Sequence, residues 1–273
     1  MTEEGPERLR SFVVPGDDTR FRRRFTIPAV KRLGALRVTS MRQRLSEPIQ
    51  AFQAHFTTSG VRFIGTRLFG FRIEVSGREH VPAGEPLIVA GGPHRNWVDG
   101  FLLLVALPPQ PRLVFLASEN VSDRWWKRLL VRLAGGFEPV STTSVLNRDA
   151  LDAALRVLAR GDRLGIFPEG WDHLEGPQRE IGPFRRGLAF VAQQSERCVL
   201  PVALAGSKPL WRGKTLRVRI GSPLDPPPMN AGKAAQQTWS DQLRATLQEL
   251  IPPEPPEIPL GQRRWPWLTD LFN

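Results

Sequence analysis

Residues 87–107 read LIVAGGPHRNWVDGFLLLVAL, and this stretch decides the fold. It opens with a short apolar run, residues 87–90, that ends at the chain breakers Gly91-Gly92-Pro93. Apolar runs of this length bounded by Gly and Pro are typical of strands that are buried on both faces of a sheet. A polar loop comes next, and residues 97–107 then follow a helical pattern. The stretch therefore predicts a strand, a loop and a helix in that order.

The same succession of strand and helix recurs along the chain. The other expected strands lie at residues 69–75, 113–116, 164–167, 199–204 and 216–220. The other expected helices lie at residues 123–133, 187–195 and 236–251, with one more between Asn147 as its N-cap and Gly161 as its terminator. Alternation of this kind predicts the α/β class, with a central, mostly parallel sheet flanked by helices on both faces.

Composition narrows the class of protein further. The 273 residues are 41% hydrophobic and 24% charged, which suits one large domain or two modest ones and argues against a disordered chain. The single cysteine, Cys198, excludes a disulfide framework and a thiolate zinc cluster and fits a reducing compartment. The first residues lack the pattern of a secretory signal, and the longest aliphatic run, 101–107, falls short of the roughly 18–20 residues that span a bilayer. We therefore expect a cytoplasmic protein, and attachment to a membrane surface stays open.

Positive charge is concentrated at the beginning of the chain. The formal net charge is +11, and residues 1–44 hold ten Arg and one Lys against five acids. Arg22-Arg23-Arg24 lies between Phe21 and Phe25, so we expect a basic, helical, amphipathic segment at 1–60 before an α/β domain at 61–250. Such a segment either packs on the domain or docks on anionic lipid, where each basic residue adds about 1 kcal/mol. No nucleic-acid fold signature accompanies the charge, so a nucleic-acid partner is not expected.

A Pro-rich linker and an Arg/Trp tail occupy residues 251–273. The linker contains Pro252-Pro253-Glu254-Pro255-Pro256, and the tail contains Arg263-Arg264-Trp265-Pro266-Trp267. Two interpretations fit this composition. The tail is either a strap over the α/β domain or a segment at a membrane interface, where Trp and Arg are both favoured.

Two loops carry the residues with candidate chemistry, and open α/β sheets place ligands at such strand ends. His94 and Asp99 are separated by four residues at the start of a predicted helix, where the carboxylate can reach back to the imidazole. A His held at Nδ1 in this way has Nε2 to accept a proton from a hydroxyl. The second loop reads Phe167-Pro168-Glu169-Gly170. The residues alone leave open that His94 is structural and that Glu169 is a surface acid.

These motifs resemble, in order and spacing, the glycerolipid acyltransferases of the 1-acylglycerol-3-phosphate acyltransferase family. The resemblance rests on the His-x4-Asp motif, on Phe167-Pro168-Glu169-Gly170, on residues 199–203 and on PFRRG at 183–187, and it spans about residues 70–222. It implies a membrane-associated enzyme that moves a fatty acyl group from acyl-CoA or acyl-carrier protein to a lipid hydroxyl, without a metal or other cofactor. It also implies that His94 is the general base, that Asp99 orients it, and that Phe167, Pro168, Glu169 and Gly170 line the acceptor site.

Besides Pro93, which stands where the family usually has an Asn before the His, two segments depart from the family pattern in ways that concern the acceptor. The family has an Arg where this chain reads Glu138 to Thr142, and Thr-Arg-Ser where it reads Trp171-Asp172-His173. Arg148, Arg185 or Arg186 then bind the acceptor phosphate, or the acceptor is not a simple phosphomonoester. The departures keep two alternatives open, a non-catalytic lipid-binding protein and an acyl-thioester hydrolase. His173 with His94, Asp99 and Glu169 makes a weak case for a metal, and none is expected. The expected location is the inner face of the membrane.

Overall fold

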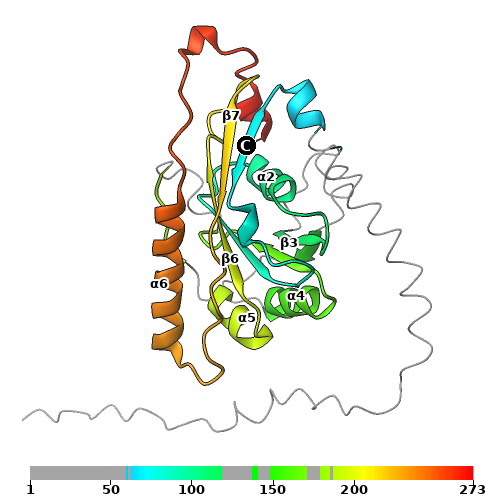
Figure 1. The fold of residues 1–273 in the computed structure, drawn as a ribbon, viewed down its shortest axis with the longest axis vertical. Coiled ribbons are helices and arrows are strands. Elements are labelled where there is room, and N and C mark those ends of the chain that lie inside the picture. Colours follow the sequence, from blue (N-terminus) through cyan, green and yellow to red (C-terminus); the bar gives the residue numbers. More distant parts are fainter. Residues whose placement is uncertain are drawn as a thin grey trace, which may run out of the picture. The chain divides into compact units, whose positions relative to one another are not determined.

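The computed structural model describes residues 60, 63–118, 137–140, 148–170, 179–184 and 187–272. Within them, seven strands form one sheet in the order β1-β7-β6-β2-β5-β3-β4 (Figure 1). Their bounds are β1 Arg72–Ser76, β2 Ile88–Gly92, β3 Leu113–Ser118, β4 Phe137–Val140, β5 Arg163–Ile166, β6 Val199–Ala205 and β7 Thr215–Ile220. All neighbours pair in parallel except β6 and β7, which are antiparallel. The prediction of a central, mostly parallel sheet is confirmed.

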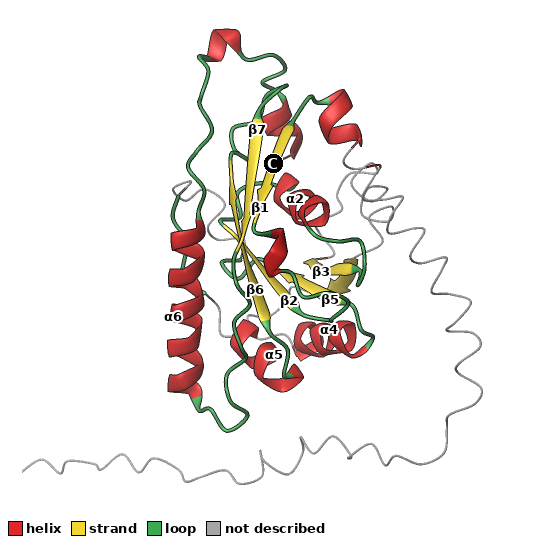
Figure 2. Ribbon diagram, in the orientation of Figure 1, coloured by secondary structure: helices red, strands yellow, loops and turns green. Residues whose placement is uncertain are grey.

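Helices cover both faces of this sheet, as the sequence predicts (Figure 2). On one face lie α2 (Val98–Ala106) and the short α7 (Leu268–Phe272), and on the other lie α4 (Arg148–Ala159), α5 (Gly187–Ser195) and α6 (Lys233–Leu250). Three further short helices are η1 (Ile64–Leu68), η2 (Arg78–His80) and η5 (Leu260–Gln262). Strand β2 shows how one strand serves both faces, because Val89 packs toward α2 while Ile88 and Ala90 pack toward α4 and α5.

Burial follows the position of each strand in the sheet. Every residue of the central strands β2 and β6 is buried, since helices cover both of their faces. Strand β7 alternates between buried and half-buried residues, and the edge strand β1 has no buried residue. The apolar runs in the sequence thus mark the strands at the centre of the sheet, where the two candidate loops begin.

Strand β4 is not among the strands expected from the sequence; it is only four residues long and contains Pro139. A Pro cannot donate to a ladder, so it argues against a strand except at an edge, and β4 is the last strand of the sheet. The expected helix at 123–133 lies outside the described residues. So does the basic segment at 1–60, apart from its last residue.

The segment after α6 packs back on the domain. Arg217 Nη1 donates to the carbonyl oxygen of Pro253 at 2.9 Å, and the Arg212 N–H donates to that of Arg264 at 2.7 Å. Leu268 in α7 is completely buried, so the segment has the arrangement of a strap. Among the described residues, no helix combines the length and the apolar character that crossing a bilayer requires.

Candidate active site

The loop between β2 and α2 is organised by one carboxylate. Asp99, in the first turn of α2, is completely buried, and its Oδ2 accepts hydrogen bonds from His94 Nδ1 at 3.1 Å, the Arg95 N–H at 2.6 Å and the Asn96 N–H at 2.8 Å. An ionised carboxylate only accepts hydrogen bonds, so Nδ1 of His94 carries a proton in this arrangement and Nε2 is the acceptor nitrogen. The predicted pairing of His94 with Asp99 is therefore present, and it sets the tautomer that a general base needs.

Glu169 ties the second loop to the first. Its side chain is buried, with the residue 1% exposed. Oε1 accepts from the His94 N–H at 3.0 Å, and Oε2 accepts from the Gly182 N–H at 2.9 Å and lies 3.5 Å from Arg95 Nη1. Glu169 is thus not a surface acid, and both of its oxygens hold backbone around the histidine.

An aromatic ring supports the imidazole from one side. The ring of Phe167 stacks on that of His94 with centroids 4.0 Å apart, and Phe115 lies parallel to Phe167 at 6.1 Å. Two glycines make room for this stack. A Cβ on Gly91 would lie 2.8 Å from the ring of Phe167, and one on Gly165 would lie 2.5 Å from the ring of Phe115. Both distances are below any real contact, so these positions require glycine.

Two buried side chains of the loop were not singled out by the sequence analysis. Arg95 is 4% exposed, and its guanidinium donates to the carbonyl oxygens of His94 at 2.9 Å and Glu180 at 2.6 Å. Asn96 Oδ1 accepts from the Val98 N–H at 3.1 Å at the start of α2. In the sequence, an Arg and an Asn in a polar loop look like surface residues, and only the fold shows that they hold the loop together.

The remaining predicted site residues lie in the turn around Glu169, at the start of α4, or outside the described residues. Pro168 and Gly170 form the turn around Glu169, in which the Gly170 N–H donates to the Phe167 carbonyl oxygen at 3.2 Å and Gly170 has a φ of 71°. Arg148 is the exposed first residue of α4. Because α4 leads directly into β5, its beginning faces the sheet edge at which β2 and β5 end, although no described contact joins Arg148 to His94. Arg185, Arg186, Thr142 and residues 171–173 lie outside the described residues.

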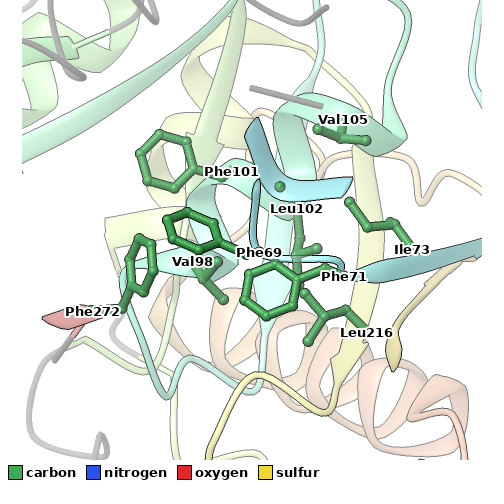
Figure 3. Close-up of a pocket in the computed structure, with 10 residues that line it drawn as sticks. Phe69, Phe71, Ile73, Val98, Phe101, Leu102, Val105, Leu216 and Phe272 are labelled. Atoms are coloured by element: carbon green, nitrogen blue, oxygen red, sulfur yellow. The ribbon is translucent and has the colours of Figure 1, made fainter. Parts of the chain in front are cut away.

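A cavity of about 70 Å³ lies beside this loop on the α2 face of the sheet (Figure 3). Val98, the neighbour of Asp99, lines one part of it, and Val105 lies two helical turns further along α2. The other lining residues come from η1, β1 and its lead-in, α2, β7 and α7, and apart from one glycine they are all apolar: Gly65, Phe69, Phe71, Ile73, Phe101, Leu102, Leu216 and Phe272. Apolar cavities of this kind take hydrocarbon rather than water.

Residues 72–205, which contain both loops, match the family described as acyltransferase and so form an acyltransferase domain. A 1-acyl-sn-glycerol-3-phosphate acyltransferase of Bacillus subtilis is 25% identical over 155 residues, which cover 56% of this chain and 73% of that protein. The human 1-acyl-sn-glycerol-3-phosphate acyltransferase alpha is 26% identical over 155 residues, 56% of this chain and 53% of its own. Over this part of the chain the protein is an acyltransferase similar to the glycerolipid acyltransferases.

Two further similarities concern a mycobacterial protein and a solved structure. An uncharacterised protein of Mycobacterium tuberculosis is 30% identical over 186 residues, which cover 63% of this chain and 49% of that protein. The match therefore spans about half the length of the human and mycobacterial proteins. The crystal structure of the 1-acyl-sn-glycerophosphate acyltransferase PlsC from Thermotoga maritima superposes with a TM-score of 0.56 at 21% identity and covers 72% of this chain and 80% of that one. It has the same fold.

Proposed function

We propose that this acyltransferase moves a fatty acyl group from acyl-CoA or acyl-carrier protein to a hydroxyl of a glycerophospholipid or related lipid, on the cytoplasmic surface of a membrane. The observation that carries the proposal is the buried Asp99 carboxylate on Nδ1 of His94, at 3.1 Å in a loop fixed by further hydrogen bonds. No redox step or cofactor enters such a transfer, since the thioester is already activated.

His94 and Asp99 divide the proton chemistry between them. Nε2 of His94 takes the proton of the acceptor hydroxyl while the oxygen attacks the thioester carbonyl. The tetrahedral intermediate then expels the thiolate, which receives the proton from the imidazolium, so the enzyme returns to its starting state. The Asp99 carboxylate stabilises the imidazolium in between. General-base assistance of this kind contributes on the order of 10² to 10⁴ in rate.

The apolar cavity supplies a place for a fatty chain. From Val98 to Val105 it extends along α2 for about 10 Å, starting next to Asp99. Each methylene group that leaves water for such a surface contributes about 0.8 kcal/mol. An acyl chain lying here would hold its carbonyl near His94, and Arg148, Arg185 and Arg186 are the candidates for binding a phosphate of the acceptor.

Product analysis tests the proposal and separates it from the alternatives. The protein is incubated with palmitoyl-CoA and a panel of lysophospholipids, and the lipids are analysed by mass spectrometry. An acylated lysophospholipid is the expected product. Free fatty acid in its place would identify a thioester hydrolase, with water as acceptor. Absence of both products with acyl-CoA and with acyl-carrier protein would leave a non-catalytic lipid-binding protein.

A further inference from the structure

Large apolar side chains are exposed in two short segments of the described chain. Of the six that are exposed among the described residues, five lie at 63–68 or 260–267, and the sixth is Met229 on its own. Leu260 is 74% exposed, Trp267 50% and Trp265 39%. Scattered apolar residues on a surface need no explanation, but a cluster marks an interaction site.

Hydrogen bonds bring the two segments together although they are almost 200 residues apart in the sequence. The loop before β7 connects them, because the Gly213 N–H donates to the Phe69 carbonyl oxygen at 3.0 Å and the Arg212 N–H donates to that of Arg264 at 2.7 Å. The guanidinium of Arg212 also lies 5.1 Å from the ring of Trp265, which is 6.0 Å from that of Trp267. We call this surface, made of Leu68, Leu260, Trp265, Trp267, Arg212 and Arg264, the aromatic face.

The aromatic face lies at the same edge of the sheet as the active site. It adjoins the first residues of β1 and β7, and both strands run opposite to β6, β2 and β5. The beginnings of β1 and β7 therefore share an edge with the ends of β2 and β5, where His94 and Glu169 are held. Figure 1 shows η1 and η5 at one end of the β1–β7 pair. The active-site loops and the exposed aromatic residues thus lie at the same edge of the sheet.

The apolar cavity connects the aromatic face with the active site. Gly65 and Phe69 belong to the segment around η1, Phe272 belongs to α7, and all three line the cavity. The rings of Phe69 and Phe272 are 5.8 Å apart, and the carbonyl oxygen of Phe272 accepts from the Trp97 N–H at 3.0 Å, three residues after His94. The aromatic face therefore borders the place proposed for the fatty chain.

The chemistry of the face matches a lipid bilayer. Trp residues prefer the boundary between headgroups and hydrocarbon, and Arg favours anionic headgroups. Arg212 and Arg264 in the face and Arg67 beside it are at least partly exposed. Asp270 in α7 is an exposed residue of opposite charge. We propose that the aromatic face docks on the membrane and so presents the cavity and the His94 loop to lipid. The inference rests on the proposed lipid acceptor, although docking itself is independent of catalysis.

Vesicle binding by the full chain tests this proposal. Binding to vesicles of phosphatidylcholine and phosphatidylglycerol is measured by co-sedimentation at about 0.1 M and about 1 M salt, where the Debye length falls from about 10 to about 3 Å. High salt suppresses the contribution of the basic residues and leaves that of the apolar ones. The variant carries Leu260→Ser and Trp267→Ser, and Met229→Ser is the matched control because Met229 is 56% exposed outside the face.

The double variant is expected to lose about tenfold or more in vesicle partitioning at both salt concentrations, while the control binds like the wild type. Quenching of tryptophan fluorescence by brominated lipid should fall in the same variant. Equal binding of the double variant and the wild type would overturn the proposal. A wild type that binds no vesicles while it acylates a micellar acceptor would also overturn it, and that result would leave the proposed acyl transfer standing. Binding that depends on the face without any acyl transfer would support docking and overturn the proposed function.

Discussion

Gly91 shows how closely the base is packed. A Cβ at this position would lie 2.8 Å from the ring of Phe167 and 2.9 Å from Cδ1 of Leu103. We expect Gly91→Ala to displace Phe167, on which His94 stacks, to lower turnover, and to lower the free energy of unfolding by about 1–3 kcal/mol. Urea unfolding and an acyl-transfer assay check both effects. Gly261→Ala is the control, because a Cβ there meets nothing within 4 Å, and wild-type behaviour of Gly91→Ala would contradict the packing described here.

For single residues, the sequence predicts some of the contacts in the site but not others. The pairing of His94 with Asp99 is predictable, since a loop followed by the first turn of a helix brings these positions together whatever surrounds them. The burial of Glu169 is not, because its partners at His94 and Gly182 come from separate segments that only the folded sheet brings together. Arg95 was missed for the same reason, as it reaches Glu180 across 85 positions of sequence.

Among the elements, the central strands and most helices are predictable because periodicity and chain breakers are local signals. The expected helix at 187–195 has the bounds of α5. Strand β4 is not predictable, because a short edge strand with a Pro gives no such signal. The arrangement of the segment after α6 also depends on long-range contacts, so composition alone leaves two interpretations open.

Helix α7 is expected to influence which fatty chains are accepted. Phe272 forms part of the cavity wall near Val98, whereas Val105 lies two turns further along α2. We expect Phe272→Leu to widen the cavity and to raise the ratio of kcat/KM for long over short acyl-CoA. Val105→Phe should fill the cavity and lower the same ratio. The two variants control for each other, and ratios that do not change, or change in the same direction, would show that the chain lies elsewhere.

Lys214, which precedes β7, makes the loop beneath the strap sensitive to pH. It is 2% exposed, donates from Nζ to the Pro209 carbonyl oxygen and lies 4.1 Å from the ring of Trp211. Burial lowers the pKa of this ammonium group from 10.5 to about 8. Between these values the unfolded chain binds the extra proton, so stability rises with pH across this window and is reduced below it.

The difference in unfolding free energy between wild type and Lys214→Met isolates this site, because other groups cancel. It should shift in favour of the wild type by up to about 3 kcal/mol between pH 7 and pH 10.5. Urea unfolding at a series of pH values measures it. A difference that is constant over this range would show that Lys214 has an ordinary pKa in the folded protein.

For the whole molecule, charge and apolar surface are expected to serve different parts of membrane binding. Residues 1–44 hold a net charge of +6 out of the +11 of the chain. Replacing Arg22, Arg23 and Arg24 by Gln should weaken binding to anionic vesicles at low salt, by about 1 kcal/mol for each Arg, and should have little effect at about 1 M salt. Co-sedimentation at both salt concentrations checks this. Unchanged binding at low salt would exclude the basic segment from the interface.

The central claim is that His94, oriented by Asp99, activates a lipid hydroxyl. Its most direct test is the release of free thiol from acyl-CoA in the presence of an accepted lysophospholipid, compared between the wild type and His94→Ala. The predicted result is a loss of turnover by a factor on the order of 10² to 10⁴, without loss of the folded state by circular dichroism. Equal turnover of His94→Ala and the wild type would contradict the claim.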